Sequence, residues 1–284
     1  MRTDIDLGRR KSFGKALMLG AGVGLAAMPS VGAREAGDPS DEDILNFALN
    51  LEYLEAEYYT RGVTGRGLVE GNVQGGSQVP FQSDDVRDIL AEIAANERAH
   101  VAYLRGVLKN DAIKFPAVDF IGGFREAGKR AGLGDNFNPF ADEVSFMLGG
   151  YLFEDVGVTA YKGASPLIDD DDVLEASAGI LAVEGYHMGS LRWLLYRRGE
   201  RAHLTANAIS DARDALDGPM DLDQGITKPG PQGIRANIVP TDEFGRAFSR
   251  TPQQVLNIVY LTPQKNMGRG GFYPNGMNGA ITTT

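Results

Sequence analysis

The sequence predicts an all-α protein, in which a four-helix bundle over residues 41–200 is followed by a long C-terminal extension over residues 201–284. Two observations indicate the bundle. Four segments carry apolar residues at the three- and four-residue spacing of amphipathic helices. A glutamate followed by a histidine three residues later recurs in two of these segments. The chain beyond residue 217 is rich in Pro, Gly and Asn but keeps many aromatic and branched residues, so we expect it to pack on the bundle.

Residues 1–33 have the pattern of a cleaved export signal. Arg9, Arg10 and Lys11 precede an apolar, Gly- and Ala-rich run over residues 16–28, and small residues follow up to Ala33. The paired arginines favour the twin-arginine route, and an ordinary Sec signal is the alternative. The apolar run is too short for a lasting transmembrane helix. We therefore expect an exported protein, periplasmic or extracellular, with no stable membrane anchor.

The composition is that of a soluble globular protein with a proper core, at 43% hydrophobic and 23% charged residues in 284. The absence of Cys excludes disulfides, thiolate metal sites and a cysteine nucleophile. The formal net charge of -10 argues against nucleic acid as a partner.

The first bundle helix is expected over residues 44–60, after acidic residues that suit a helix N-terminus. A Gly-rich stretch without periodicity, residues 61–83, predicts a long loop. The second helix begins after Ser83 and continues to about residue 110. The segment over residues 117–134 is only weakly helical in pattern.

The third helix is expected to open at Asn138 and to end near residue 163. Four consecutive aspartates, residues 169–172, mark the start of the fourth helix, and a calcium site is the alternative interpretation of this run. A basic end followed by Gly199 closes that helix. Shorter helices are predicted over residues 205–216 and 251–261.

Two of the three histidines in the chain follow a glutamate by three residues, as Glu97/His100 and Glu184/His187. Residues three apart project from the same side of a helix, so each pair can present a carboxylate and an imidazole to one point. Both pairs interrupt the apolar stripe of their helix, in surroundings that repeat from one helix to the other. A carboxylate on a core face is costly unless it is paired or binds a metal, so these pairs are candidate ligands.

The other two helices share a second pattern. Each has an apolar stripe interrupted by one glutamate, Glu52 or Glu154, with a tyrosine seven residues later, Tyr59 or Tyr161. Glu52 is preferred over the neighbouring Glu55 because its spacing to the tyrosine matches that of the other helix; Glu55 remains an alternative ligand or a group that supports one.

One Glu from each of two helices, with one Glu-x-x-His from each of the other two, is typical of dinuclear iron or manganese sites in bundles. We therefore predict two Fe or Mn ions, with Zn as a geometric alternative. The predicted ligands are Glu52, Glu97, His100, Glu154, Glu184 and His187. Tyr59 and Tyr161 are candidates for a catalytic, redox or ligand-supporting role, and packing aromatics are the alternative.

Other conspicuous residues receive structural interpretations. His203 is expected at the surface, and Trp193 and Met188 in the core. Arg105 and Arg192, each one residue beyond the ligand face, are expected to form structural ion pairs.

Residues 45–59, the two Glu-x-x-His helices and the C-terminal stretches 248–260 and 270–279 resemble the ferritin-like superfamily, and more narrowly the desiccation-related ferritin-like proteins. The resemblance implies that the superfamily's ligand pattern falls on the six residues named above. It also implies a link to drying or oxidative stress. The long Gly-rich loop and the C-terminal extension depart from ferritins proper, so a hollow storage shell is not expected.

We therefore expect an exported dinuclear metal protein that reacts with dioxygen or peroxide, as a ferroxidase or a peroxide-detoxifying protein. Glu97 and Glu184 would bridge the ions, His100 and His187 would be terminal ligands, and the remaining two glutamates would complete the shell. The rival hypothesis is a non-catalytic stress-protective protein with a structural or vestigial metal site. The sequence does not decide whether the protein is an enzyme, and it is compatible with a homo-oligomer.

Overall fold

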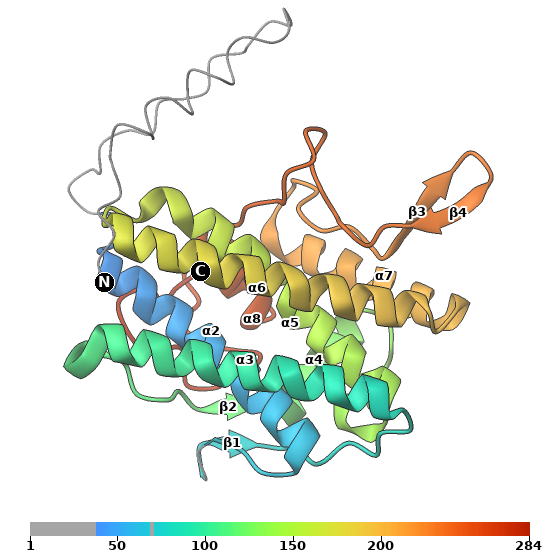
Figure 1. Cartoon of the computed structure of the whole chain (residues 1–284), viewed down its shortest axis with the longest axis horizontal. Helices are drawn as coiled ribbons and strands as arrows, with labels where there is room; N and C mark the ends of the chain where they lie inside the picture. The colour runs from blue at the N-terminus through green and yellow to red at the C-terminus, as the bar shows by residue number, and fades with distance from the viewer. Residues whose placement is uncertain (1–37, 69–70) are drawn as a thin grey trace, which may run out of the picture. The chain divides into compact units, whose positions relative to one another are not determined.

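A computed structural model describes residues 38–68 and 71–284 of the chain, and the predicted export signal lies outside them. Four long helices form the bundle (Figure 1). They are α2 (Asp41–Thr64), α3 (Asp84–Leu108), α5 (Glu143–Ala164) and α6 (Asp171–Tyr196). Helix α2 packs chiefly on α3 and α5 chiefly on α6, and further contacts join α2 to α5 and α3 to α6. The predicted all-α, bundle-based fold class is confirmed.

Acidic and hydroxyl side chains start these helices, as their sequence pattern predicts. Ser40 and Asp43 form a reciprocal capping box at the start of α2. Asp170 caps α6 by accepting hydrogen bonds from two backbone N–H groups, so the aspartate run serves the helix start. The prediction that the third helix opens at Asn138 is wrong. Pro139 begins a separate 3-10 turn, and Asp142 then takes an extended backbone and caps α5.

Short elements connect the bundle helices. They are β1 (Val73–Gln74), η1 (Lys109–Asp111), β2 (Val118–Asp119), α4 (Phe120–Arg130), η2 (Pro139–Ala141) and η3 (Ser165–Leu167). Strands β1 and β2 pair in parallel, which ties the long Gly-rich loop to the segment before α4. Helix α4 is regular despite its glycines, because Asp119 caps it and Phe120 and Phe124 bury its inner side.

The C-terminal extension contains α7 (Glu200–Asp217), β3 (Thr227–Gly230), β4 (Gly233–Ala236) and α8 (Pro252–Val259). Helix α7 starts five residues earlier than predicted, because Gly199 turns the chain at a φ of 85° and α7 begins at the next residue. Strands β3 and β4 form an antiparallel hairpin that extends away from the helices (Figure 1). Helix α8 contacts α5 and α7, so part of the extension covers the bundle.

Six buried charged residues, which we call the ion-pair cluster, join the extension to the bundle. They are Asp155, Arg192, Arg213, Asp217, Asp223 and Arg250. Arg192 contacts Asp155 at 2.5 Å, and Arg213 contacts Asp155 at 2.9 Å. Arg213 and Arg250 reach Asp223 at 2.6 and 2.9 Å. Three positive and three negative charges therefore satisfy one another where unpaired charges would be very costly.

The Gly-rich stretch near the C-terminus makes a turn that brings two aromatic rings into the core. Gly271 has a φ of 48°, and a Cβ on it would lie 2.5 Å from the carbonyl oxygen of Val259. Phe272 and Tyr273 follow and are fully buried. The Tyr273 hydroxyl donates to the backbone oxygen of Asn50 on α2. The stretch thus closes the bundle beside the helix that carries Glu52.

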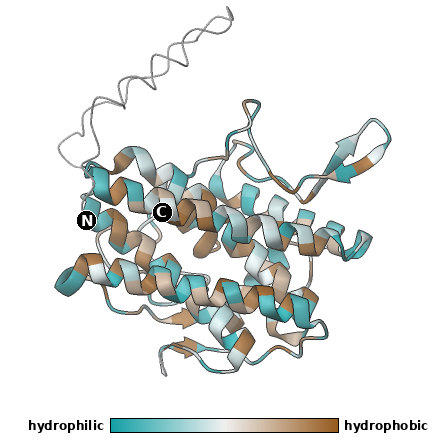
Figure 2. Ribbon diagram, viewed as in Figure 1, coloured by the Kyte–Doolittle hydropathy of each residue, from teal (hydrophilic) through white to brown (hydrophobic). Residues whose placement is uncertain are grey.

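The helices have hydrophobic and hydrophilic sides in the pattern of a bundle (Figure 2). Met188 is buried as predicted, but the prediction for Trp193 is wrong. Its side chain is 50% exposed, because it lies on the outer side of α6, where it stacks on Tyr196 and Arg197 lies over its ring. His203 is only half-buried and stacks on Tyr196. None of the described helices is both long and apolar enough to cross a membrane.

Candidate metal centre

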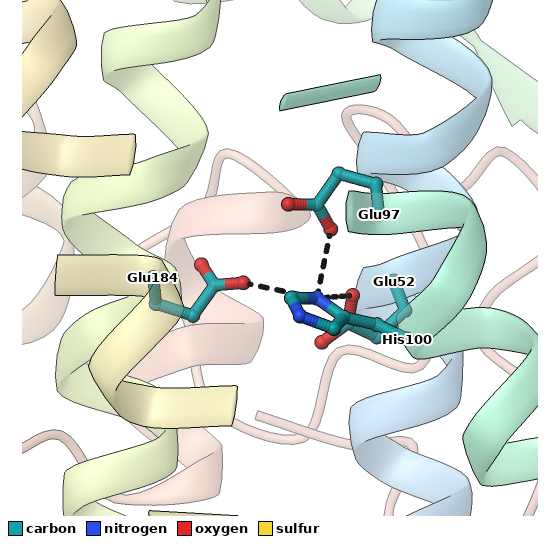
Figure 3. Close-up of side chains that lie close together, drawn as sticks. All are labelled: Glu52, Glu97, His100 and Glu184. Carbon is teal, nitrogen blue, oxygen red and sulfur yellow. Dashed lines mark hydrogen bonds and ion pairs between the residues drawn. The ribbon is translucent and has the colours of Figure 1, made fainter. Parts of the chain in front are cut away.

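The two Glu-x-x-His pairs face each other inside the bundle. Glu97 and Glu184 are fully buried, and His100 and His187 are 8% and 3% exposed. Helix geometry explains the pairing, because residues three apart on α3 or α6 project to the same side. Figure 3 shows side chains from α2, α3 and α6 converging on the ring of His100.

One group of four residues surrounds what we call the His100 position. It comprises Glu52, Glu97, His100 and Glu184, with one donor atom from each lying within 4.8 Å of the others. His100 Nδ1 lies 3.2 Å from Glu52 Oε2, 3.5 Å from Glu97 Oε2 and 3.6 Å from Glu184 Oε1. A single cation placed among these donors would be within reach of an imidazole and three carboxylates.

A second group surrounds the His187 position. It comprises Glu97, Glu154, Glu184 and His187, again with donor atoms within 4.8 Å of one another. His187 Nδ1 lies 2.8 Å from Glu97 Oε1 and 3.4 Å from Glu154 Oε2. Glu97 and Glu184 belong to both groups, and we call them the shared carboxylates. All six residues predicted as ligands therefore lie together, in two groups that share two carboxylates.

The donors at this centre fit a pair of cations because most of the carboxylate oxygens are otherwise unsatisfied. Both carboxylate oxygens of Glu97, Glu154 and Glu184 are buried without a hydrogen-bond partner, as is His187 Nδ1. Burial, and then repulsion from neighbouring carboxylates, raises the pKa of Glu97 and of Glu184 well above the ordinary range. Two divalent ions would supply four positive charges against four carboxylates, and oxygen and nitrogen donors suit Fe or Mn.

Both predicted tyrosines lie beside a ligand of the opposite helix. Tyr161 on α5 donates a hydrogen bond to Glu52 on α2. Tyr59 on α2 has a buried hydroxyl without a hydrogen-bond partner. Burial, and then the nearby charge of Glu154 on α5, raises the pKa of Tyr59. Each tyrosine is thus placed to act on a ligand, and their catalytic role stays a prediction.

Glu55 is buried but belongs to neither group of candidate ligands. It lies among apolar side chains of α2, α5 and α8. Burial, and then the charges of Glu154 and Glu52, raises its pKa well above the ordinary range. The preference for Glu52 as the α2 ligand therefore agrees with the geometry, and Glu55 adds a fifth carboxylate close by.

Three contacts at the centre were not predicted. The Asn96 amide Nδ2 lies 3.2 Å from His187 Nε2. Gly157 leaves room for a shared carboxylate, since a Cβ there would lie 2.5 Å from Glu184 Oε2. Arg105 donates to the hydroxyl of Tyr53 and forms no ion pair with another described residue, whereas Arg192 forms the predicted one. Asn96 directly precedes Glu97, but nothing in the sequence of either helix indicates its contact with His187.

Comparison with known proteins gives a consistent result. Residues 40–197 match the family model described as ferritin-like domain. The chain is 30% identical over 268 residues to ferritin-like catalase Nec2 of Nesocodon mauritianus, a match that covers 86% of this chain and 85% of that protein. It is 32% identical over 240 residues to desiccation-related protein PCC13-62 of Craterostigma plantagineum, covering 76% of each. No solved structure matches the chain.

Proposed function

The chain belongs to the ferritin-like domain family, and from that membership we propose that it holds two Fe or Mn ions and uses them to decompose hydrogen peroxide. The observation that carries the proposal is the pair of interlocking ligand groups that share Glu97 and Glu184. The relative named as a catalase supports peroxide as the substrate. Family membership also bears out the resemblance inferred from the motifs.

When bound, two neighbouring redox-active ions can exchange two electrons with peroxide, so that one molecule is reduced to two waters and a second is oxidised to dioxygen and two protons. The two protons released by the second molecule match the two that the first consumes. The reaction therefore needs no external reductant. Oxidation of Fe(II) by dioxygen or peroxide is the related activity of such a centre, and it would need iron as a substrate.

The protein itself would bind the ions, orient their ligands and shield both from water. The four glutamates would neutralise the ions, and the two histidines would be neutral terminal ligands. The Tyr161 hydroxyl donates to Glu52 and thereby fixes the orientation of that carboxylate. Burial raises the pKa of Tyr161, so its phenol keeps its proton near neutral pH. The surrounding apolar core keeps bulk water away from the ligands, which strengthens the electrostatic attraction between the carboxylates and a bound cation.

We also propose that the protein is exported, periplasmic or extracellular, by the twin-arginine route. The arginine pair and apolar run in residues 1–33 support this route, which carries folded cargo and suits a protein loaded with metal before export. A role in protection from drying or oxidative stress is supported by the desiccation-related relative. That same relative favours the second candidate function, a protective protein whose metal is structural.

Elemental analysis of the natively exported protein, with peroxide assays on the same sample, tests the proposal. We expect about two Fe or Mn per chain, and oxygen evolution from peroxide. A His100→Ala/His187→Ala double variant should lose both, and His203→Ala, away from the centre, should keep both. Bound metal without oxygen evolution from peroxide would favour the protein whose metal is structural over a catalyst. No bound or retained metal would overturn the proposal.

A further inference from the structure

The two halves of the metal centre are related by an internal repeat. The α3 and α6 pairs correspond, with Glu97 matching Glu184 and His100 matching His187. The α2 and α5 ligands correspond in the same way, and each is followed seven residues later by a tyrosine. Two ion positions built from matching ligands would be expected to bind with similar affinity.

The repeat is broken at the residue that directly precedes each ligand glutamate of α3 and α6. On α3 this residue is Asn96, and its amide meets the ring of His187 across the helix interface at 3.2 Å. On α6 the corresponding residue is Val183, which has no polar side-chain atom. Among the described residues, no hydrogen bond is formed to Nε2 of His100. Among the described residues, only His187 therefore has a hydrogen-bond partner at Nε2.

A second difference lies in how the remaining ligands are engaged. At the His100 position, Glu52 already accepts a hydrogen bond from the Tyr161 hydroxyl. Its other oxygen lies 3.2 Å from His100 Nδ1. A cation that enters there must break the contact between these two ligands. At the His187 position, both oxygens of Glu154 lack a hydrogen-bond partner, and His187 Nδ1 lies 2.8 Å from the shared carboxylate Glu97. A cation there would displace no hydrogen bond of Glu154, whereas Glu52 at the other position already accepts one from Tyr161.

We propose that the two ion positions are unequal, and that Asn96 is a positioning residue that makes the His187 position the tighter one. The inference rests on the proposed di-metal function. An imidazole that binds a cation through Nδ1 carries its proton on Nε2. A 180° rotation of the Asn96 side-chain amide would present its oxygen to His187, where it can accept a hydrogen bond from Nε2–H. This contact fixes both the tautomer and the orientation of the ring.

The structure also indicates which position exchanges its ion. The His100 side chain is 10% exposed, against 4% for His187, and its Nε2 has no hydrogen-bond partner among the described residues. The His100 position is thus expected to fill second and to lose its ion first.

The test is a titration of the chelator-stripped protein with Mn(II) alone, followed by calorimetry or by the electron paramagnetic resonance of free Mn(II). The wild-type chain should show two binding steps with different dissociation constants. Asn96→Leu should weaken the tighter step by roughly 10- to 100-fold and leave the weaker one unchanged. Asn96→Asp, which still accepts the hydrogen bond, should keep the tighter step. Glu154→Gln should remove the tighter step, and Glu52→Gln the weaker one.

The matching gain-of-function variant is Val183→Asn, which supplies the missing partner to His100 and should strengthen the weaker step. Equal dissociation constants in the wild type, or an Asn96→Leu variant that weakens neither step or both alike, would overturn the inference while leaving the di-metal function intact. A wild-type chain that binds neither Mn(II) nor Fe(II) would overturn both. Urea unfolding of the metal-free Asn96 variants, expected to match the wild type, separates positioning of His187 from a general loss of structure.

Discussion

Replacing a shared carboxylate by its neutral amide should stabilise the metal-free protein and abolish its stabilisation by metal. Glu97→Gln is the variant of choice, because Glu97 is fully buried and neither of its oxygens has a hydrogen-bond partner. In the absence of cations the charged carboxylate is disfavoured by burial and by repulsion from Glu184. Relieving that cost should raise the free energy of unfolding at pH 7 by about 1–3 kcal/mol.

The effect has a defined pH dependence. The folded protein raises the pKa of Glu97 well above its ordinary value of 4.5, so the folded state holds a proton that the unfolded chain has released. The contribution of Glu97 to the free energy of unfolding is therefore largest in acid. This contribution falls as the pH rises from about 4.5 to the folded-state pKa, by about 1.4 kcal/mol per pH unit for the one proton involved. Glutamine does not titrate, so the advantage of the variant should grow with pH over this range.

Urea unfolding followed by circular dichroism at several pH values, with a chelator present, measures the prediction. Glu92→Gln is the matched control, since Glu92 lies on the same helix but is exposed, and it should change nothing. Free metal at 100 times its dissociation constant should then stabilise the wild type by about 2.7 kcal/mol and Glu97→Gln hardly at all. A metal-free Glu97→Gln protein that is less stable than the wild type at every pH would refute the reasoning.

Three further changes test separate contacts. In the metal-free protein, Tyr161→Phe should lower the free energy of unfolding by about 1–2 kcal/mol, because it removes the hydrogen bond to Glu52. Tyr59→Phe should be neutral or slightly stabilising, because the Tyr59 hydroxyl has no hydrogen-bond partner. Urea unfolding midpoints of the two variants measure the difference. Gly157→Ala should lower metal content in elemental analysis, since its Cβ would lie 2.5 Å from a shared carboxylate, while Gly189→Ala meets open space and should stabilise the chain by about 0.5–1 kcal/mol. Arg250→Met should destabilise the protein by about 3–5 kcal/mol in the same unfolding assay, because it strips two buried aspartates of a partner.

The bundle and its candidate ligands were predictable because their signals are local. Apolar spacing fixes which side of each helix is buried, and a glutamate on that side, such as Glu154, is conspicuous in one segment alone. The helix ends were also predictable from nearby capping residues, except before α5, where two candidate caps lie close together. Asn138 and Pro139 resemble a helix start, but Asp142 is the residue that caps α5.

Contacts between distant segments left no such signal. Arg213 and Asp155 are 58 residues apart, and nothing near either residue indicates the other. Trp193 is expected in the core, but its side chain is half exposed on the outer side of α6. The bond between Asn96 and His187 depends on how α3 and α6 face each other, which the sequence of either helix does not specify.

The ion-pair cluster also sets the order in which the protein can be completed during synthesis. Asp155 is adjacent to the ligand Glu154, and Arg250, at the far end of the cluster, donates its backbone N–H to Thr159 on the same helix. Until residue 250 has emerged from the ribosome, Asp217 and Asp223 lack one of their positive partners. The helix that carries Glu154 therefore gains these contacts with the ion-pair cluster only after residue 250 has been translated, so the candidate ligand Glu154 reaches its final surroundings late in synthesis.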